Sequence, residues 1–515
     1  MVLFEKDVSS PVEYAFGLWN RYVSQTKQEY RSKTGQYATP PEVARYMASL
    51  VPSGLREMRL LDPGAGTGIL TSAYAEYASR NEGLEHLIVD LYETENLIVD
   101  YLDDSMRFLR DWLSARGVSI DYRIIDEDFL IRNGALFADH SQGVLVDEEI
   151  EKYSSVIMNP PYFKLNKSDT RARVASSIVH GQPNIYFLFL MLGALLLRED
   201  GVLVSISPRS FTSGLYFKAF RARFFDLMHP SSIHLFTSRT ETFKHSDVLQ
   251  ETLILKAERK SLQTTTVITT SNGSIDLTSP TRLEVVTDEI LRESDGRILF
   301  VPTSEEELAL MKKIESWPET ISSLGLRVST GPVVPFRATE YLRKEPGENT
   351  VPLLWMHNIQ LMEVNWPLDI SKPQHIEDSA TSHRLLVSNQ PYVLIHRFSA
   401  KEQSRRFVAA PLNPTSFDFD WIGIENHVNY LHKPKGRLSY SECVGISALL
   451  CTRTLDSYIR IKSGNTQVNA SDMMNLPLPP LDTIQLLGEE IMAAEHVDLD
   501  SMEEYVLSQL DLSEL

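Results

Sequence analysis

Residues 58–68 read MRLLDPGAGTG. A short apolar run leads into an acidic residue and a turn with three glycines, and a helix-like stretch follows. Glycine lets a backbone pass close beneath a ligand because it has no Cβ. The spacing differs from the GxGxxG pattern of dinucleotide-binding folds, so the turn by itself does not indicate a pyrophosphate. A tight structural turn between a strand and a helix explains this stretch equally well.

Strand-like and helix-like segments alternate on both sides of this turn. The apolar runs are 87–93 (LIVDLYE), 122–125 (YRII), 154–158 (SSVIM) and 201–207 (GVLVSIS), and helical patterns separate them. Such alternation predicts an α/β domain over residues 1–310, with a doubly wound, Rossmann-like parallel sheet. The Ser- and Thr-rich segment 261–286 is typical of an edge or connecting element. Residues 311–515 lose the alternation and are long enough for a separate α+β domain that ends in acidic helices.

Polar residues occur at the carboxyl ends of three successive predicted strands, where ligands bind in sheets of this kind. An acidic residue after the second strand commonly accepts hydrogen bonds from ribose hydroxyls. A carboxylate and an aromatic ring after the third strand can accept from an exocyclic amine and cover a purine face. The pattern predicts a site shaped for a nucleoside. The residues concerned are Asp62, Gly64 and Gly66 at the first strand, Glu93 at the second, and Asp128 and Phe129 at the third.

The fourth strand runs into Asn159-Pro160-Pro161-Tyr162. Two prolines cannot continue a ladder of hydrogen bonds, but they fix φ and so hold the carbonyls of Asn159 and Pro160 with little entropy left to lose. Two acceptors that grip the hydrogens of a planar amino group favour its pyramidalisation and direct its lone pair toward an electrophile. Tyr162 offers a flat ring on which a base can stack. We therefore interpret the motif as a catalytic loop that works by positioning and polar preorganisation.

These motifs, together with GQYATPPEVARYMASL at 35–50, resemble the gamma-class DNA adenine-N6 methyltransferases of type II restriction-modification systems. The resemblance covers roughly residues 30–260 and implies S-adenosyl-L-methionine as cofactor and base flipping of the target adenine in double-stranded DNA. It assigns Tyr37 and Thr39 to the lip of the cofactor site and Asp62 to the methionine end. It assigns Glu93 to the ribose, Asp128 and Phe129 to the cofactor adenine, and the NPPY loop to catalysis. Phe243 would cover the second face of the flipped base.

The C-terminal region resembles the target-recognition half of BsuBI/PstI-like modification methylases. The stretch 392–407 (YVLIHRFSAKEQSRRF) is basic, so we expect Arg397, Lys401, Arg405 and Arg406 to contact DNA phosphates or base edges. A solvated basic strand face is the competing interpretation. We expect a monomer, no metal site, and any cognate restriction endonuclease on a separate chain. A fused nuclease is not expected, because only about 30 residues precede the first motif.

The charge of the chain neither requires nor excludes DNA as a partner. The chain has a formal net charge of −19, but residues 463–515 alone hold 11 Asp and Glu and no Lys or Arg. Residues 321–462 hold 16 basic and 13 acidic residues, so an acidic protein can still present a basic face. Cys443 and Cys451 predict two buried reduced thiols. The absence of a long apolar run and of a signal-like start predicts a cytoplasmic protein without membrane segments.

Other substrates remain open at this point. The NPPY chemistry also serves cytosine-N4, an RNA base or a protein glutamine, each of which presents a planar amino group. Methylation of a cytosine ring carbon would need a Cys nucleophile in the active loop, and neither cysteine is near one. A non-catalytic specificity subunit is disfavoured because competent residues occupy every cofactor and catalytic position.

Overall fold

The computed structural model describes residues 10–80, 83–138, 152–179, 183–237, 251–274, 276–292, 294–397, 405–463, 473–494 and 498–512. By its contacts the chain divides into two compact units, unit 1 (Met1–Thr303) and unit 2 (Ser304–Leu515). The boundary that we placed after residue 310 falls inside helix α13 (Glu305–Glu315), which the contacts assign to unit 2. Ser304 starts that helix as its N-cap, because its side chain accepts a hydrogen bond from the Glu307 backbone N–H.

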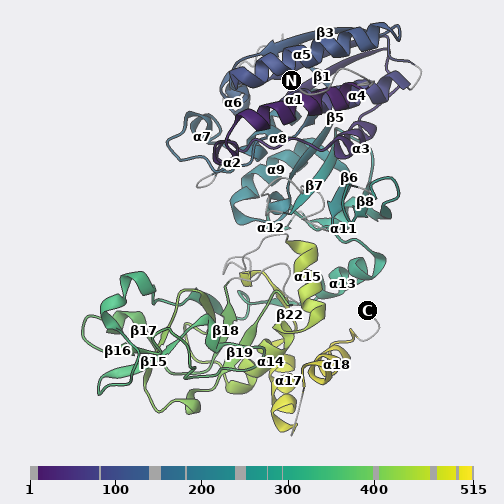
Figure 1. The fold of residues 1–515 in the computed structure, drawn as a ribbon. Helices are drawn as coiled ribbons and strands as arrows, with labels where there is room; N and C mark the ends of the chain where they lie inside the picture. The colour runs from purple at the N-terminus through teal and green to yellow at the C-terminus, as the bar shows by residue number, and fades with distance from the viewer. Residues whose placement is uncertain are drawn as a thin grey trace. The chain divides into compact units, whose positions relative to one another are not determined.

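Unit 1 is built on a nine-stranded sheet with the order β3-β2-β1-β4-β5-β7-β6-β8-β9 (Figure 1). The first five strands in this order are parallel, which confirms the predicted α/β class. β7 runs antiparallel to β5 and β6, so the whole sheet is mixed and not purely parallel as expected. The strands are β1 (Glu57–Pro63), β2 (His86–Tyr92), β3 (Ser119–Ile125), β4 (Tyr153–Met158), β5 (Leu197–Pro208), β6 (Met228–Phe236), β7 (Thr252–Arg259), β8 (Thr265–Ser271) and β9 (Thr281–Val286).

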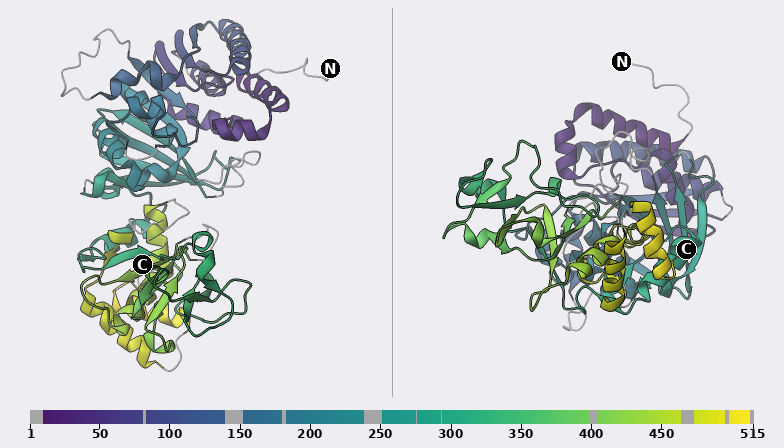
Figure 2. Two further views of the ribbon diagram at one scale, coloured as in Figure 1. Left: turned by 90° about the vertical axis from the view of Figure 1, so that its left-hand side faces the viewer. Right: turned by 90° about the horizontal axis from the view of Figure 1, so that it is seen from below.

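Helices cover both faces of this sheet. One face packs with α1 (Pro11–Gln25), α3 (Pro41–Leu50), α4 (Ile69–Arg80) and α5 (Asn96–Ser114) into a continuous apolar core. The other face receives α8 (Ile185–Leu196) and α9 (Lys218–Leu227), and the left view of Figure 2 shows the helices layered against the teal strands. Shorter helices are α2 (Gln28–Thr34), α6 (Phe129–Arg132), α7 (Thr170–Val174), α11 (Thr287–Ile290) and α12 (Ser294–Arg297), and β10 (Leu291–Arg292) pairs with β11 (Ile298–Leu299).

The sequence explains these two kinds of helix. In α5 the buried residues Ile98, Leu102, Met106, Leu109 and Leu113 recur at helical spacing, so one stripe faces the core and the rest faces water. α8 (IYFLFLMLGALL) has no charged residue and is buried at all of its positions. An entirely apolar helix is stable in water only when neighbours surround it. In the part of the chain that the structure describes, no helix is both long and apolar enough to cross a membrane.

The described part of unit 2 is α+β, with two small sheets and a two-stranded pair, β12-β22. One has the order β13-β21-β18-β19 and is antiparallel, and the other has the order β14-β16-β15-β20-β17. Figure 2 shows the yellow C-terminal helices against the green strands of the same unit. The strands are β12 (Glu319–Thr320), β13 (Arg327–Thr330), β14 (Leu342–Arg343), β15 (Thr350–Leu354), β16 (His375–Glu377), β17 (Leu386–Ser388), β18 (Tyr392–His396), β19 (Ala409–Leu412), β20 (Trp421–Ile424), β21 (Val428–His432) and β22 (Pro477–Leu478).

Most of the described α-helices of unit 2 lie late in the sequence. α13 begins the unit, whereas α14 (Tyr440–Leu450), α15 (Arg453–Lys462), α17 (Leu481–Ala493) and α18 (Leu499–Gln509) follow most of the strands, and the last two are the expected acidic helices. α14 packs on β18 and β19 and, on its other side, on α17. Cys443 and Cys451 are buried free thiols, as expected.

Candidate active site

A cavity of about 540 Å³ opens in unit 1 where the carboxyl ends of β1, β2 and β4 meet. This volume suits a nucleoside-sized ligand. The glycine turn after β1, the ends of β2 and β4, the start of α6 and the segment between α2 and α3 form its wall. The sequence-predicted residues on this wall are Tyr37, Thr39, Gly64, Gly66, Glu93, Asp128, Phe129, Asn159 and Pro161.

The glycine turn and Glu93 form one hydrogen-bonded unit. The Glu93 carboxylate accepts from the backbone N–H groups of Gly66 (3.2 Å), Thr94 (2.8 Å) and Glu95 (3.0 Å). Gly66 has φ +54°, a conformation that side-chain-bearing residues rarely adopt. Burial raises the pKa of Glu93, against the opposing effect of these N–H donors. The result is a carboxylate of fixed orientation that can accept from hydroxyl groups of a ligand.

Asp62 does not lie on the cavity wall. Its side chain is fully buried, and one carboxylate oxygen accepts from the Thr71 hydroxyl at 2.8 Å. Burial raises its pKa to about 7. Asp62 therefore fixes the start of α4 behind the glycine turn, and a direct contact between its carboxylate and a ligand in the cavity is not part of this geometry.

Asp128 and Phe129 form the end of the cavity next to α6. One Asp128 oxygen caps α6 by accepting from the backbone N–H groups of Leu130 (2.9 Å) and Ile131 (3.0 Å). The other oxygen lies 3.7 Å from a guanidinium nitrogen of Arg171. The Phe129 ring is buried and makes an edge contact with Tyr92 at a centroid distance of 5.0 Å. Together they offer an acceptor beside an apolar ring.

The side chain of Asn159 is held from both ends. Its Nδ2 donates to the carbonyl oxygen of Tyr37 (2.9 Å) and to the Thr39 hydroxyl (3.1 Å). Its Oδ1 accepts from the Tyr162 hydroxyl at 2.6 Å. Because an amide oxygen has two lone pairs, one acceptor site on Oδ1 is left for another donor. The amide is thus fixed with its oxygen as the group that can receive an amino hydrogen.

Tyr162 is packed between other rings. Its ring lies 6.3 Å from Tyr37 at an interplanar angle of 22° and 6.3 Å from Tyr186, edge to face. Its hydroxyl also lies 2.9 Å from the carbonyl oxygen of Ile206 in β5. Burial raises the pKa of Tyr162, so the hydroxyl remains a donor. Pro160 is buried behind the loop.

The segment between α2 and α3 reaches the loop Asn159–Tyr162 because of Gly35. Gly35 has φ +68°, and a Cβ at this position would lie 2.6 Å from the backbone nitrogen of Tyr162. Only glycine allows this approach, which brings Tyr37 and Thr39 within hydrogen-bond distance of Asn159.

The structure corrects two of the expected DNA contacts. Arg405 is buried in unit 2, and its guanidinium forms an ion pair with Glu503 at 3.1 Å. Arg406 is also buried. An arginine inside the unit is not available to a phosphate, so neither residue is a DNA contact. Arg397 is half-buried and donates to the Asn426 carbonyl oxygen at 3.3 Å. Phe243 and Lys401 lie outside the described residues.

Two parts of the cavity wall were not expected from the sequence. Arg171 of α7 makes a bidentate contact with Asp169 at 2.9 and 2.7 Å besides its approach to Asp128. The Tyr30 hydroxyl of α2 donates to Glu95 at 2.5 Å and closes one side of the cavity. The contacts of Arg171 with Asp128 and of Tyr30 with Glu95 join segments far apart in the sequence, so the sequence around Arg171 does not mark it as part of the wall. The GQYATPP stretch is the nearest signal, because it places α2 beside the site.

Comparisons with known proteins show which family the sequence matches. The model of the family described as Eco57I restriction-modification methylase matches residues 75–243. The type II methyltransferase M.PstI of Providencia stuartii is 32% identical over 463 residues, which are 90% of this chain and 90% of that protein. The type II methyltransferase M.BsuBI of Bacillus subtilis is 33% identical over 487 residues, covering 93% of this chain and 95% of that protein.

A solved structure has a similar fold over nearly the whole length of this chain. The type IIL restriction-modification enzyme MmeI, solved in complex with DNA, aligns with a TM-score of 0.50 at 10% identity, and the alignment covers 97% of this chain and 73% of that one. At this identity the likeness shows the fold alone.

Proposed function

The chain belongs to the type II DNA methyltransferases of restriction-modification systems, and on that premise we propose that it is a sequence-specific adenine-N6 methyltransferase that uses S-adenosyl-L-methionine. One observation carries the proposal. The Asn159 amide is held at the cavity by Tyr37, Thr39 and Tyr162 so that its oxygen can accept a hydrogen from an amino group. An exocyclic amine of an extruded adenine is such a group.

The cavity residues fit the proposed cofactor. Glu93 would accept from the ribose hydroxyls, because three backbone N–H groups already fix its carboxylate. Asp128 would accept from the adenine amine, and Phe129 would cover the ring. When bound, the cofactor supplies an electrophilic methyl group on a sulfonium. Asp62 would act indirectly, by fixing the turn through Thr71.

The chain's own residues would do the rest by positioning. Asn159 Oδ1 and the Pro160 carbonyl would hold the two hydrogens of the target amine and direct its lone pair toward the cavity. No strong base is needed, because the methylated amine loses its proton readily to water. The rigid prolines keep the entropy cost of this arrangement low. A separately encoded restriction endonuclease would act on the same site, and the methyltransferase would work as a monomer on duplex DNA.

Unit 2 offers a basic rim for the DNA backbone, which we define as Arg327, Lys433, Lys435 and Arg437. Arg327 begins β13 opposite His432 at the end of β21, and the other three follow in the next loop. Among the described residues none of the four has an ion-pair or hydrogen-bonding partner for its side-chain cation. Free cations of this kind suit phosphates.

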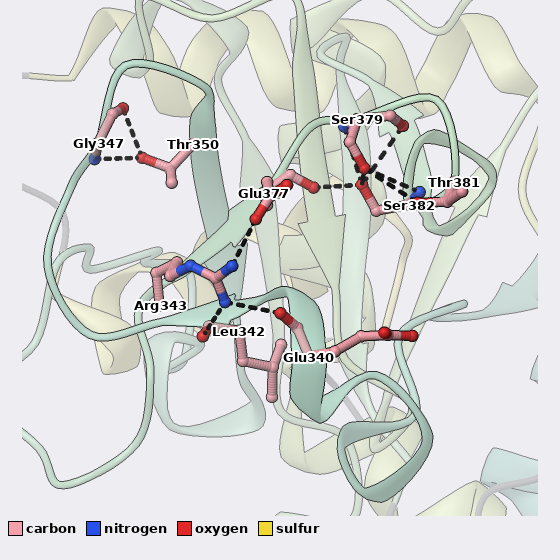
Figure 3. Close-up of polar contacts among 9 residues, drawn as sticks. All are labelled: Glu340, Leu342, Arg343, Gly347, Thr350, Glu377, Ser379, Thr381 and Ser382. Carbon is pink, nitrogen blue, oxygen red and sulfur yellow. Dashed lines mark hydrogen bonds and ion pairs between the residues drawn. The ribbon is translucent and has the colours of Figure 1, made fainter.

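Not every cation of unit 2 is available in this way, and Arg343 is one that is engaged inside the unit. Arg343 donates to the carbonyl oxygens of Glu340 (2.7 Å) and Leu342 (2.9 Å) and to the Glu377 carboxylate at 2.5 Å, as Figure 3 shows. We therefore place the backbone contacts at the rim and retain Arg397 as a proposed neighbour at the end of β18.

Mapping of modified bases tests the proposed function. The chain is expressed in a host without DNA methylation, and genomic DNA is read by single-molecule sequencing. We expect N6-methyladenine within one short sequence motif. N4-methylcytosine, or no modified base at all, would overturn the assignment.

Asn159→Ala tests the mechanism on the motif so identified. The methylation rate should fall at least about 10²-fold, the scale at which one preorganised polar group acts. Binding of S-adenosylhomocysteine and of the duplex, measured by calorimetry and anisotropy, should persist and so report a folded protein. A variant with full activity would show that the amide has no catalytic role.

A further inference from the structure

An exposed apolar tip follows β5 in unit 1. Residues 213–217 link the 3₁₀ helix η3 (Arg209–Thr212) to α9, and Leu215, Tyr216 and Phe217 form the 3₁₀ helix η4 (Leu215–Phe217). Leu215 is 55% exposed and Tyr216 is 65% exposed. Two adjacent large apolar side chains would gain hydrophobic stabilisation if a partner covered them.

The tip is anchored from beneath in spite of its exposure. The guanidinium of the fully buried Arg221 donates to the carbonyl oxygens of Gly214 (2.7 Å) and Phe211 (3.0 Å) on one side and of Gly296 (3.0 Å) on the other. The Phe217 ring packs edge to face on Phe187 at a centroid distance of 5.2 Å. A tip held from beneath in this way presents Leu215 and Tyr216 without paying the entropy of ordering them on contact.

The tip lies beside the catalytic loop. β4 and β5 are parallel neighbours with Met158 opposite Ser205, so Asn159 and the tip emerge at the same edge of the sheet. A chain of rings joins them, since Tyr162 contacts Tyr186 at 6.3 Å and Tyr186 contacts Phe217 at 5.9 Å. The Tyr186 hydroxyl also lies 3.0 Å from the hydroxyl of Ser210 in η3.

One exposed cation beside the tip suits a polyanion. Residues 209–223 contain four basic residues and no acidic one, but Arg209 and Arg221 are buried and Arg223 donates to the Phe137 carbonyl oxygen at 2.8 Å. Lys218, directly after the tip, is exposed and has no partner for its ammonium group among the described residues. A duplex that delivers an adenine to Asn159 would therefore find an apolar pair and a cation within reach of the same strand.

We propose that Tyr216, supported by Leu215, presses into the duplex beside the extruded base and stabilises the flipped state. This inference rests on the proposed function. Extrusion leaves a gap in the base stack and costs the energy of unpairing and unstacking. Apolar side chains that enter such a gap replace part of the stacking that extrusion removes. Tyr216 is then a positioning residue, because it acts on the duplex and not on the reacting atoms.

A duplex with a weakened target pair isolates this role. The Leu215→Ala/Tyr216→Ala double variant is compared with wild type on two duplexes that carry the mapped site, one fully paired and one with the target adenine opposite an abasic position. Because a mismatched base flips at lower cost, the second duplex needs the tip less. We expect kcat/KM of the variant to fall at least about tenfold on the paired duplex and less than about threefold on the other.

Leu262→Ala is the matched control. Leu262 is 98% exposed and follows β7, which runs antiparallel to β5, so it lies at the opposite edge of the sheet. It should leave both rates unchanged. Fluorescence of 2-aminopurine at the target position should rise on binding of wild type and of this control, and rise less with the double variant.

Equal losses on both duplexes, or no loss on either, would overturn the inference. Failure of the proposed function looks different, because wild type itself would then methylate neither duplex at adenine.

Discussion

At the scale of single residues, the site depends on the orientation of one amide. Asn159 can serve as acceptor only while Nδ2 faces away from the substrate, and Thr39 and the Tyr37 carbonyl hold it there. The Thr39 side chain is buried, so water does not replace its hydroxyl when it is removed. A buried donor that loses an acceptor costs about 1–3 kcal/mol.

Thr39→Val should therefore slow the methyl-transfer step by about ten- to a hundredfold, because the amide is no longer fixed. Valine keeps the shape of threonine and removes only the hydroxyl. The measurement is the single-turnover rate with cofactor and duplex saturating, which separates this effect from weaker cofactor binding. Thr39→Ser restores the hydroxyl and should recover most of the rate. A serine variant as slow as the valine variant would point to a packing defect and not to the amide.

Local sequence predicted the wall of the cavity well and ion pairs poorly. Glu93, Asp128 and Asn159 each follow a strand of the parallel part of the sheet, so the alternation of elements was enough to bring them to one edge. Arg405 looked like a DNA contact within a basic run, but its partner Glu503 lies 98 residues later in the chain. No pattern around residue 405 encodes that contact.

At the scale of elements, the direction of a strand in the sheet was harder to predict than its presence. The parallel sheet was expected from the alternation of elements, but the reversed direction of β7 depends on its pairing with β5 and β6 across the sheet. The acidic helices α17 and α18 were expected without a role. In α18, Glu503 pairs with Arg405, and Asp500 pairs with Arg453 at 3.0 Å. Part of the C-terminal negative charge therefore serves to dock this helix on unit 2.

The contact between α14 and α17 depends on two glycines. A Cβ on Gly488 would lie 1.9 Å from the Ser441 carbonyl oxygen, and a Cβ on Gly445 would lie 2.0 Å from that of Ile484. Backbone approaches backbone here, so no side chain can move aside. Gly488→Ala should push the helices apart and cost about 1–3 kcal/mol or more. Faster amide hydrogen exchange in peptides covering 440–450 and 481–493 would report this.

Gly17→Ala should change the stability of the protein in the opposite direction from Gly488→Ala. Gly17 also lies inside a helix, α1, but a Cβ there would meet nothing within 4 Å. Alanine should then stabilise α1 by up to about 1 kcal/mol, because glycine loses more entropy in a helix.

For the Gly488→Ala protein, unchanged hydrogen exchange in α14 and α17 would mean that the two helices do not depend on the close approach of their backbones.

At the scale of the whole molecule, the net charge of −19 and a DNA substrate are compatible because charge is unevenly distributed. Residues 463–515 contribute −11 of this net charge because they contain no Lys or Arg, and some of their carboxylates pair with arginines of the same unit. The basic rim at Arg327 and 433–437 stays without internal carboxylate partners in the described part of unit 2. Association with DNA then depends on local cations and not on the total charge.

The salt dependence of DNA binding tests this distribution. Lys435→Gln/Arg437→Gln removes two exposed cations of the rim, and Lys344→Gln/Arg384→Gln removes two exposed cations elsewhere in unit 2, so both double variants change the net charge equally. Removing one cation that touches a phosphate lowers the slope of log K against log salt by about 1. Anisotropy titrations between low and moderate salt should show a slope lower by up to about 2 for the rim variant only, with equal weakening on cognate and unrelated duplexes. Equal slopes for the two variants would mean that the rim does not touch the backbone and that only the overall charge matters.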